Sequence, residues 1–136
     1  MIALFIGRFQ PFHKGHLDAF AQIEADKIII GIGSAQYSGT ENNPYSFTER
    51  RKMITKKLDK SNLNYEIIAI PDIHNPPKWV EHVKNIVGKF DVVYTGNELV
   101  KNLFLEKGYT VKIIKKNINI SGTAIRQKYD QKTKNK

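Results

Sequence analysis

"IALFIGRFQPFHKGH", residues 2–16, joins an apolar run to a loop of unusual composition. The run Ile2–Ile6 is rich in the β-branched and aromatic side chains that favour strands. A loop that only turns the chain is usually built from Gly, Asn, Asp and Ser. Residues 7–16 instead carry Arg, Gln, Lys and two His, which donate hydrogen bonds or carry positive charge. We therefore expect a buried strand followed by an anion-binding loop.

His13 and His16 are three residues apart at the expected start of the first helix. A helix that begins near Lys14 would direct both imidazoles toward its N-terminal opening, where free N–H groups and the helix dipole favour anions. Gly15 between them allows a ligand to approach the backbone closely. Each His alone could be an ordinary helix-start or core residue. The pair favours phosphate binding, with imidazoles that donate hydrogen bonds or, when protonated, offset charge on a transferring phosphoryl group.

Strand-like and helix-like segments alternate along the rest of the chain. We expect strands at Ile2–Ile6, Lys27–Gly33, Tyr65–Ile70, Phe90–Thr95 and Tyr109–Lys115. We expect helices at Leu17–Ala25, Phe47–Lys60, Pro77–Val87 and Glu98–Lys107, and a last one from about Gly122. This alternation predicts an α/β fold, with a single doubly wound five-stranded parallel sheet covered by helices on both faces.

Several helix ends carry recognisable boundary residues. The stretch "SFTE", residues 46–49, fits a capping box, and Pro77 fits a first helical turn. Gly88 and Gly108 fit helix stops. The loops that follow the parallel strands should open together at one edge of the sheet, where such folds bind ligands.

Length and composition indicate one ordinary domain. The 136 residues contain no apolar stretch of membrane-spanning length, no visible signal peptide and no cysteine, so we expect a cytoplasmic protein without disulfides or thiolate metal sites. We expect residues 1–136 to form a single domain that ends in a polar tail or helix end at about 128–136.

The net charge of +9 favours anionic partners such as nucleotides or nucleic acids. Much of the excess lies in clusters that look like solvated surface, at residues 56–57, 115–116 and 128–136. No stripe of alternating aromatic and basic residues suggests nucleic-acid binding. We expect neither a nucleic acid nor a membrane as a partner.

A second group of phosphate-binding candidates lies near the end of the chain, in "ISGTAIRQK", residues 120–128. Ser121 and Thr123 are natural helix N-caps, and Gly122 allows close backbone approach. Arg126 could grip a phosphate with two N–H groups. Such a motif alone is usually only a cap, but together with the first cluster it predicts a polyphosphate site.

These motifs together are similar to one enzyme family. "GRFQPFHKGH" with "SGTAIR" resembles the paired motifs of the HxGH nucleotidyltransferase superfamily. "GIGSAQ", "FTERRKMI", "PDIHNPPKWVEHV" and "FDVVYTGNELV" extend the resemblance to the archaeal-type nicotinamide-nucleotide adenylyltransferases, over almost the whole chain. The resemblance implies a Rossmann-like fold and attack of the nicotinamide mononucleotide phosphate on the α-phosphate of ATP, giving NAD and pyrophosphate. It also implies Mg²⁺ on the substrate phosphates without a dedicated protein metal site, and a homo-oligomer, often a hexamer.

The resemblance also assigns site residues. It implies that His13, His16 and Arg126 are catalytic. The implied ATP-binding residues are Gly7, Arg8, Phe9, Gly15, Thr95, Gly96, Asn97, Ser121, Gly122 and Thr123. The implied residues for nicotinamide mononucleotide are Gln10, Arg50, Asp72, Asn75 and Trp79, with Trp79 stacking on the nicotinamide ring and Arg50 associated with substrate phosphate.

Alternatives remain for the reaction and for single residues. A sister enzyme that adenylylates flavin mononucleotide or phosphopantetheine would share both phosphate motifs, and a nucleotide-binding module without turnover would keep the pocket. Without the motif, Trp79 would be read as core packing and Arg50 as a cation on a helix face. Gly122 stands where most of the superfamily has a second serine, as in the archaeal branch. Family members usually continue further past this motif, so closure over the triphosphate or assembly could differ.

Overall fold

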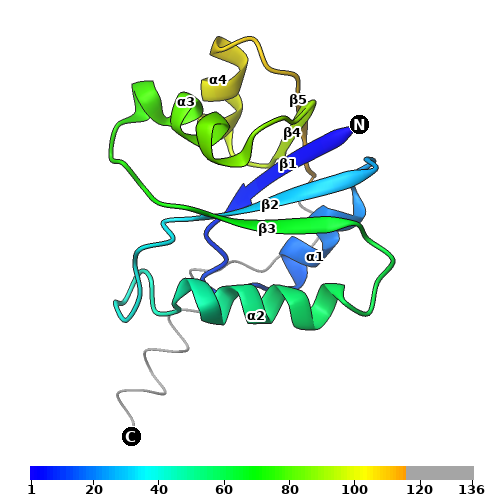
Figure 1. The fold of residues 1–136 in the computed structure, drawn as a ribbon, viewed down its shortest axis with the longest axis vertical. Helices are drawn as coiled ribbons and strands as arrows, with labels where there is room; N and C mark the ends of the chain where they lie inside the picture. The colour runs from blue at the N-terminus through cyan, green and yellow to red at the C-terminus, as the bar shows by residue number, and fades with distance from the viewer. Residues whose placement is uncertain (116–136) are drawn as a thin grey trace, which may run out of the picture.

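Five parallel strands form the centre of the fold, in the order β3-β2-β1-β4-β5 (Figure 1). The computed structural model describes residues 1–115 of the 136-residue chain. The strands are β1 (Ile2–Gly7), β2 (Lys27–Gly33), β3 (Tyr65–Ile70), β4 (Val92–Thr95) and β5 (Val111–Ile113). The predicted doubly wound parallel sheet is therefore confirmed.

The helices divide between the two faces of this sheet (Figure 1). Helices α1 (Lys14–Ala21) and α2 (Phe47–Leu58) cover one face, and α3 (Pro76–Val87) and α4 (Glu98–Glu106) cover the other. The chain moves outward from β1 through β2 to β3, and α3 then carries it back to β4 on the far side of β1. Because the connections diverge between β1 and β4, a crevice is expected at the carboxyl ends of these two strands.

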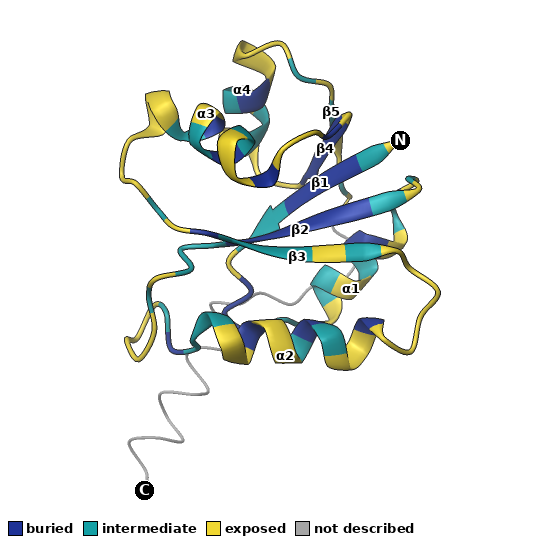
Figure 2. Ribbon diagram, viewed as in Figure 1, coloured by how far each residue is buried: buried dark blue, intermediate teal, exposed yellow. Residues whose placement is uncertain are grey.

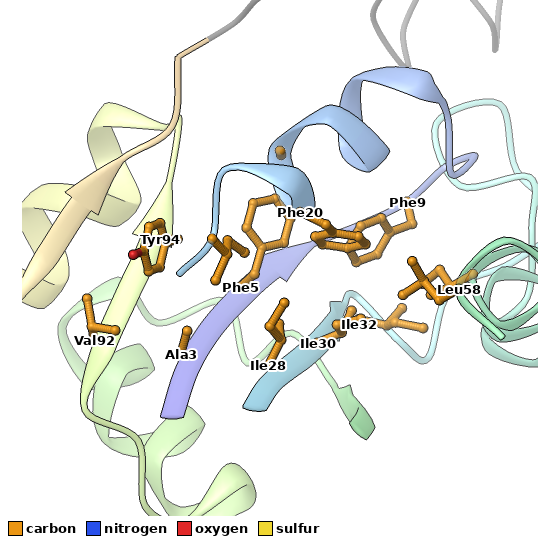
Figure 3. Close-up of a cluster of buried hydrophobic side chains, with 13 residues drawn as sticks. Ala3, Phe5, Phe9, Phe20, Ile28, Ile30, Ile32, Leu58, Val92 and Tyr94 are labelled. Carbon is orange, nitrogen blue, oxygen red and sulfur yellow. The ribbon is translucent and has the colours of Figure 1, made fainter. Parts of the chain in front are cut away.

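The central strands are buried on both faces (Figure 2). In β1, Phe5 packs with Phe9 and Phe20 beneath α1, and this cluster is drawn in Figure 3. Leu4 points to the opposite face and packs in the cluster that contains Val83 and Phe104 from α3 and α4. Burial on both sides is the reason that the strands read as continuous apolar runs rather than as alternating ones.

Most of the predicted helix boundaries are confirmed by local contacts. Ser46 Oγ accepts a hydrogen bond from Glu49 N at 3.1 Å, and Glu49 Oε1 accepts one from Ser46 N at 3.0 Å, which completes the predicted capping box of α2. Proline occupies the first turn of α3. Gly88 and Gly108 follow α3 and α4 with φ of +78° and +84°, in the left-handed region that favours glycine.

Helix α1 spans Lys14–Ala21, which agrees with the start near Lys14 that the histidine pair suggested. The apolar pattern instead predicts this helix at Leu17–Ala25. Its start is fixed by His13, whose Nδ1 accepts a hydrogen bond from Gly15 N at 3.0 Å. Histidine is not among the usual N-cap residues, so the sequence pattern placed this start too late.

The last two strands are shorter than predicted. Strand β4 begins at Val92 and β5 at Val111, so Phe90 and Tyr109 precede their strands. The rings of these two residues stack with their centroids 5.0 Å apart and pack against Phe104. The predicted helix from Gly122 and the predicted polar end at 128–136 lie outside the described residues. Among the helices of residues 1–115, none has the length and apolar character needed to cross a bilayer.

Candidate functional site

A cavity of about 500 Å³ opens at the carboxyl ends of the strands. Segments that follow β1, β2, β3 and β4 all contribute to its wall, as the parallel topology predicts. The lining residues are Ile6, Gly7, Arg8, Phe9, Gln10, Pro11, His13, His16, Gly33, Ser34, Ile70, Asp72, Trp79, Asn97 and Val100.

The two histidines form the N-terminus of α1 and one wall of the cavity. His16 Nδ1 accepts a hydrogen bond from His13 N at 3.1 Å, while His13 Nδ1 accepts from Gly15 N at 3.0 Å. The two side chains therefore build a capping box from imidazoles, and the rings stack with their centroids 3.9 Å apart. Because backbone N–H groups donate to both Nδ1 atoms, the proton of each neutral ring is on Nε2.

His16 is a neutral hydrogen-bond donor at neutral pH. Burial, with a smaller contribution from the neighbouring His13, lowers the pKa of His16 to about 3. Its Nε2–H group, at the positive end of the α1 dipole, suits an anion. The protonated form that the sequence pattern also allowed is disfavoured for His16 in the ligand-free protein.

Phe9 supports this wall from the core. Its side chain is 1% exposed, and its ring meets the His16 ring edge-on at 4.7 Å. Phe9 has a φ of +53°, which is uncommon for a bulky residue. Gly7 leaves room for the Phe9 ring, because a Cβ at Gly7 would lie only 3.1 Å from it. Phe9 thus lines the cavity as a buried ring rather than as an exposed side chain.

Trp79 lies between the main cavity and an adjoining one of about 410 Å³. The two cavities have three lining residues in common, Asp72, Trp79 and Val100. It sits in the first turn of α3, and its ring is partly buried with its edge against Phe104 at 5.6 Å. Asn75 lines the adjoining cavity next to it. Trp79 therefore packs against the core and also lines both cavities, while its stacking on the nicotinamide ring stays a prediction.

The predicted "TGN" segment after β4 has a divided role. Asn97 lines the main cavity and caps α4, because its Oδ1 accepts a hydrogen bond from Val100 N at 3.1 Å. Thr95 is buried, and its hydroxyl accepts from Asn97 N at 3.1 Å. Thr95 and Gly96 line neither cavity. Their observed contacts shape the loop that presents Asn97.

Gln10 and Arg50, both assigned to substrate by the resemblance, are buried polar residues, 2% and 0% exposed. Gln10 lines the cavity, but its amide exchanges two hydrogen bonds of 2.9 Å with the backbone of Tyr45. Arg50 lines neither cavity, and its guanidinium donates to backbone carbonyls. Burial, with a smaller contribution from the charge of Arg8, lowers the pKa of Arg50. Arg50 is thus not among the residues that line the cavity, and its assigned contact with substrate phosphate stays a prediction.

The remaining predicted residues fall into two groups. Gly15 lies within the first turn of α1 and donates to His13 rather than lining the cavity. Ser121, Gly122, Thr123 and Arg126 lie outside the described residues. Ser34 was missed as an individual site residue, although it lines the cavity with a φ of +48°. Its position directly after β2 is the sequence signal that could have identified it.

Metal binding by the protein alone has no candidate in the described part of the chain. Residues 1–115 contain no group of three or more His, Asp or Glu side chains placed to hold a metal ion. The cavity instead offers donors and cations, including the exposed Arg8 and the imidazole pair, which suit phosphate oxygens.

Comparison with known proteins agrees with this geometry. Residues 4–128 match the family described as cytidylyltransferase-like. The nicotinamide-nucleotide adenylyltransferase of Thermoplasma acidophilum is 48% identical over 131 residues, which cover 93% of this chain and 73% of that protein. The corresponding protein of Methanococcus vannielii is 50% identical over 132 residues, covering 94% and 77%. The chain belongs to the cytidylyltransferase-like family. Within it, the chain is a member of the nicotinamide-nucleotide adenylyltransferases.

A solved structure supports the placement of the chain in this adenylyltransferase family. A bifunctional NMN adenylyltransferase/ADP ribose pyrophosphatase from Francisella tularensis, complexed with AMP and a manganese ion, superposes with a TM-score of 0.76 at 27% identity. The superposition covers 96% of this chain but only 41% of that longer one. The adenylyltransferase described here thus shares its fold with one part of the bifunctional protein.

Proposed function

We propose that this protein transfers AMP from ATP to nicotinamide mononucleotide, giving NAD and pyrophosphate. The observation that carries the proposal is the single cavity that has the imidazole-capped start of α1 on one wall and Trp79 on another. A phosphate-binding wall and an aromatic platform in one cavity suit two nucleotides bound side by side. The family relatives are named for the same activity.

The reaction needs no covalent intermediate on the protein. An oxygen of the mononucleotide phosphate attacks the α-phosphorus of ATP, a new P–O bond forms, and the bond to the bridging oxygen breaks so that pyrophosphate leaves. The attacking phosphate is already anionic near neutral pH, since its second pKa is about 6. Catalysis then consists of positioning and charge stabilisation.

The α1 wall supplies that stabilisation. Negative charge on the transferring phosphoryl group would be met by the positive end of the α1 dipole and by Nε2–H of His13 and His16. These donors are held by the capping hydrogen bonds before any ligand binds, so little reorganisation is needed. Arg126, with Ser121, Gly122 and Thr123, would hold the rest of the triphosphate from the other end of the chain.

The opposite wall would hold the nicotinamide mononucleotide. The Trp79 ring, backed by Phe104, would stack on the nicotinamide, and a cationic ring adds a cation–π contribution. Asp72 and Asn75, which line the adjoining cavity, would bond to the polar groups of this substrate.

ATP would enter as its magnesium complex. The family structure from Francisella tularensis contains manganese together with AMP, which supports use of a divalent ion. Magnesium on the substrate phosphates fits a cavity that offers donors rather than a carboxylate cage. We also propose a cytoplasmic location and a homo-oligomeric assembly, as the family resemblance implies.

The direct test is to mix the full chain with ATP, Mg²⁺ and nicotinamide mononucleotide and to measure NAD and pyrophosphate. The expected result is equal formation of both products, which is lost when the metal is chelated. Flavin mononucleotide and phosphopantetheine serve as competing substrates. Faster adenylylation of either one would assign the chain to a sister activity, and binding without pyrophosphate release would identify a module without turnover.

A further inference from the structure

We propose that Arg50 is a positioning residue that fixes the shape of the phosphate end of the cavity by holding the loops after β1 and β2 through their carbonyl groups. The effect on turnover rests on the proposed adenylyl transfer, whereas the effect on the loops does not. Arg50 lies in the first turn of α2, on the side of that helix that faces the sheet.

The first set of contacts joins the ends of two neighbouring strands. One terminal nitrogen of the guanidinium, Nη1, donates to Arg8 O at 3.0 Å and to Gly33 O at 2.9 Å. Arg8 follows β1 and Gly33 ends β2, and both residues line the cavity. One side chain thus links the carboxyl ends of β1 and β2, both of which border the cavity.

The second set of contacts fixes the loop that follows β2. The other terminal nitrogen, Nη2, lies within hydrogen-bond distance of three carbonyls, those of Ser34 at 3.2 Å, Ala35 at 3.4 Å and Tyr37 at 3.3 Å. Nε donates to Ser46 O at 3.2 Å, at the start of the same helix. A guanidinium has five N–H donors and no acceptor. In Arg50 these donors are all directed at backbone carbonyls.

The charge of Arg50 is compensated by these carbonyl dipoles. None of the salt bridges found among residues 1–115 involves Arg50, although its side chain is fully buried. A buried cation is tolerated only where it is paired or fully hydrogen-bonded. Five backbone carbonyls, from the ends of β1 and β2 and the residues that follow them, meet that need. Only the planar guanidinium, with its several N–H groups, can reach all of them, and a lysine ammonium cannot reproduce this geometry.

This role differs from a contact with substrate phosphate in a measurable way. A residue that positions the loops should change the affinity for both substrates by the same factor, since the loops after β1 and β2 both line the main cavity. A direct phosphate contact should affect nicotinamide mononucleotide but not nicotinamide riboside, which lacks the phosphate.

The experiment compares Arg50→Lys and Arg50→Met with matched changes at Arg51, the exposed neighbour on the same helix. Hydrogen exchange is followed in the ligand-free chain at the amides of Ala35 and Tyr37, which bond to Ile70 O and Ser34 O. We expect faster exchange at both amides in Arg50→Lys and no change in Arg51→Lys. This readout holds even if the proposed reaction is wrong.

Binding and turnover complete the test. We expect Arg50→Lys to weaken ATP, nicotinamide mononucleotide and nicotinamide riboside by the same factor, and to lower kcat by about a hundredfold, the scale for a small misplacement in an active site. Loss confined to nicotinamide mononucleotide would overturn the proposal in favour of a phosphate contact. Unchanged exchange at Ala35 and Tyr37 would also overturn it. Global unfolding of Arg50→Lys, with Arg51→Lys still folded, would also overturn the proposal, because the contacts would then stabilise the whole fold rather than the two loops.

Discussion

At the scale of single residues, the backbone determines what each site side chain can do. The two imidazoles accept backbone N–H groups at Nδ1, so each presents Nε2–H rather than a lone pair. A general base at His16 is therefore not available in this geometry. Gln10 and Arg50 instead donate to backbone carbonyls, those of Tyr45 and Arg8 among them, and these hydrogen bonds direct their polar groups at the protein. The same residue types that suggest substrate binding in a sequence can instead build the walls of the site.

The lowered pKa of His16 predicts a pH dependence of stability. The unfolded chain binds a proton at His16 below pH of about 6.5, whereas the folded chain does so only below about 3. Stability should therefore fall as the pH falls through this window. In His16→Gln, the amide oxygen can still accept from His13 N, as in an ordinary capping box, but it does not titrate.

We expect urea unfolding at pH 8, 6 and 4.5 to show a smaller loss of stability in His16→Gln than in the original chain. At pH 8 the imidazole is neutral in both states, so that measurement gives the cost of the substitution itself. Equal losses in both proteins between pH 8 and 4.5 would contradict the lowered pKa.

Trp79 gives a prediction about substrate choice. Stacking on a base is worth about 1–3 kcal/mol by alanine substitution, so Trp79→Ala should weaken nicotinamide mononucleotide binding by roughly ten- to a hundredfold. Trp79→Phe should recover part of the loss. Calorimetric titration of each ligand, with thermal melts to confirm folding, measures this effect. Because Trp79 also packs on Phe104, equal weakening of ATP, or simple unfolding, would make it a core residue only.

At the scale of elements, the sequence predicted the sheet and most helices. For α1, the histidine pair indicated the start near Lys14, whereas the apolar pattern placed it too late. Buried parallel strands leave a strong apolar signal, and "SFTE", Gly88 and Gly108 mark boundaries by ordinary cap chemistry. The histidine cap of α1 is not of this ordinary kind. The buried state of Arg50 could not be read from the sequence either, because it depends on carbonyls 13 to 42 residues away. Long-range polar contacts have no local pattern.

Gly31 in β2 gives a prediction about the packing of sheet and side chains. A Cβ at Gly31 would lie 2.4 Å from Ile70 Cδ1 and 3.2 Å from Ile6 Cγ1, inside a packed layer. We expect Gly31→Ala to lower the free energy of unfolding by about 1–3 kcal/mol, the usual cost of overpacking. Gly33→Ala is the matched control on the same strand, since its Cβ would meet nothing closer than 3.7 Å. Urea denaturation of both variants measures the difference, and an equally stable Gly31→Ala would show that Ile70 moves freely.

At the scale of the whole molecule, the fold gathers distant segments at one edge of the sheet. The main cavity takes residues from the loops after four strands, between positions 6 and 100. The described chain then returns toward α1, where Lys115 N donates to Gln22 Oε1 at 2.9 Å and Gln22 Nε2 donates to Lys115 O at 2.7 Å.

We expect two distant parts of the chain, His16 and Arg126, to act on one triphosphate. His16→Ala should lower kcat on the order of 10²–10³-fold, because a preorganised donor is lost in the transition state. Arg126→Ala should raise the KM for ATP, and Arg126→Lys should not restore it fully, since a single ammonium cannot replace the two-pronged contact. If both residues hold the same triphosphate, the double variant should depart from additivity by more than about 0.5 kcal/mol in kcat/KM. Steady-state kinetics of the two single variants and the double variant measures this coupling. Strict additivity would place Arg126 away from the phosphates that His16 contacts, and full rescue by lysine would mean that only its charge matters.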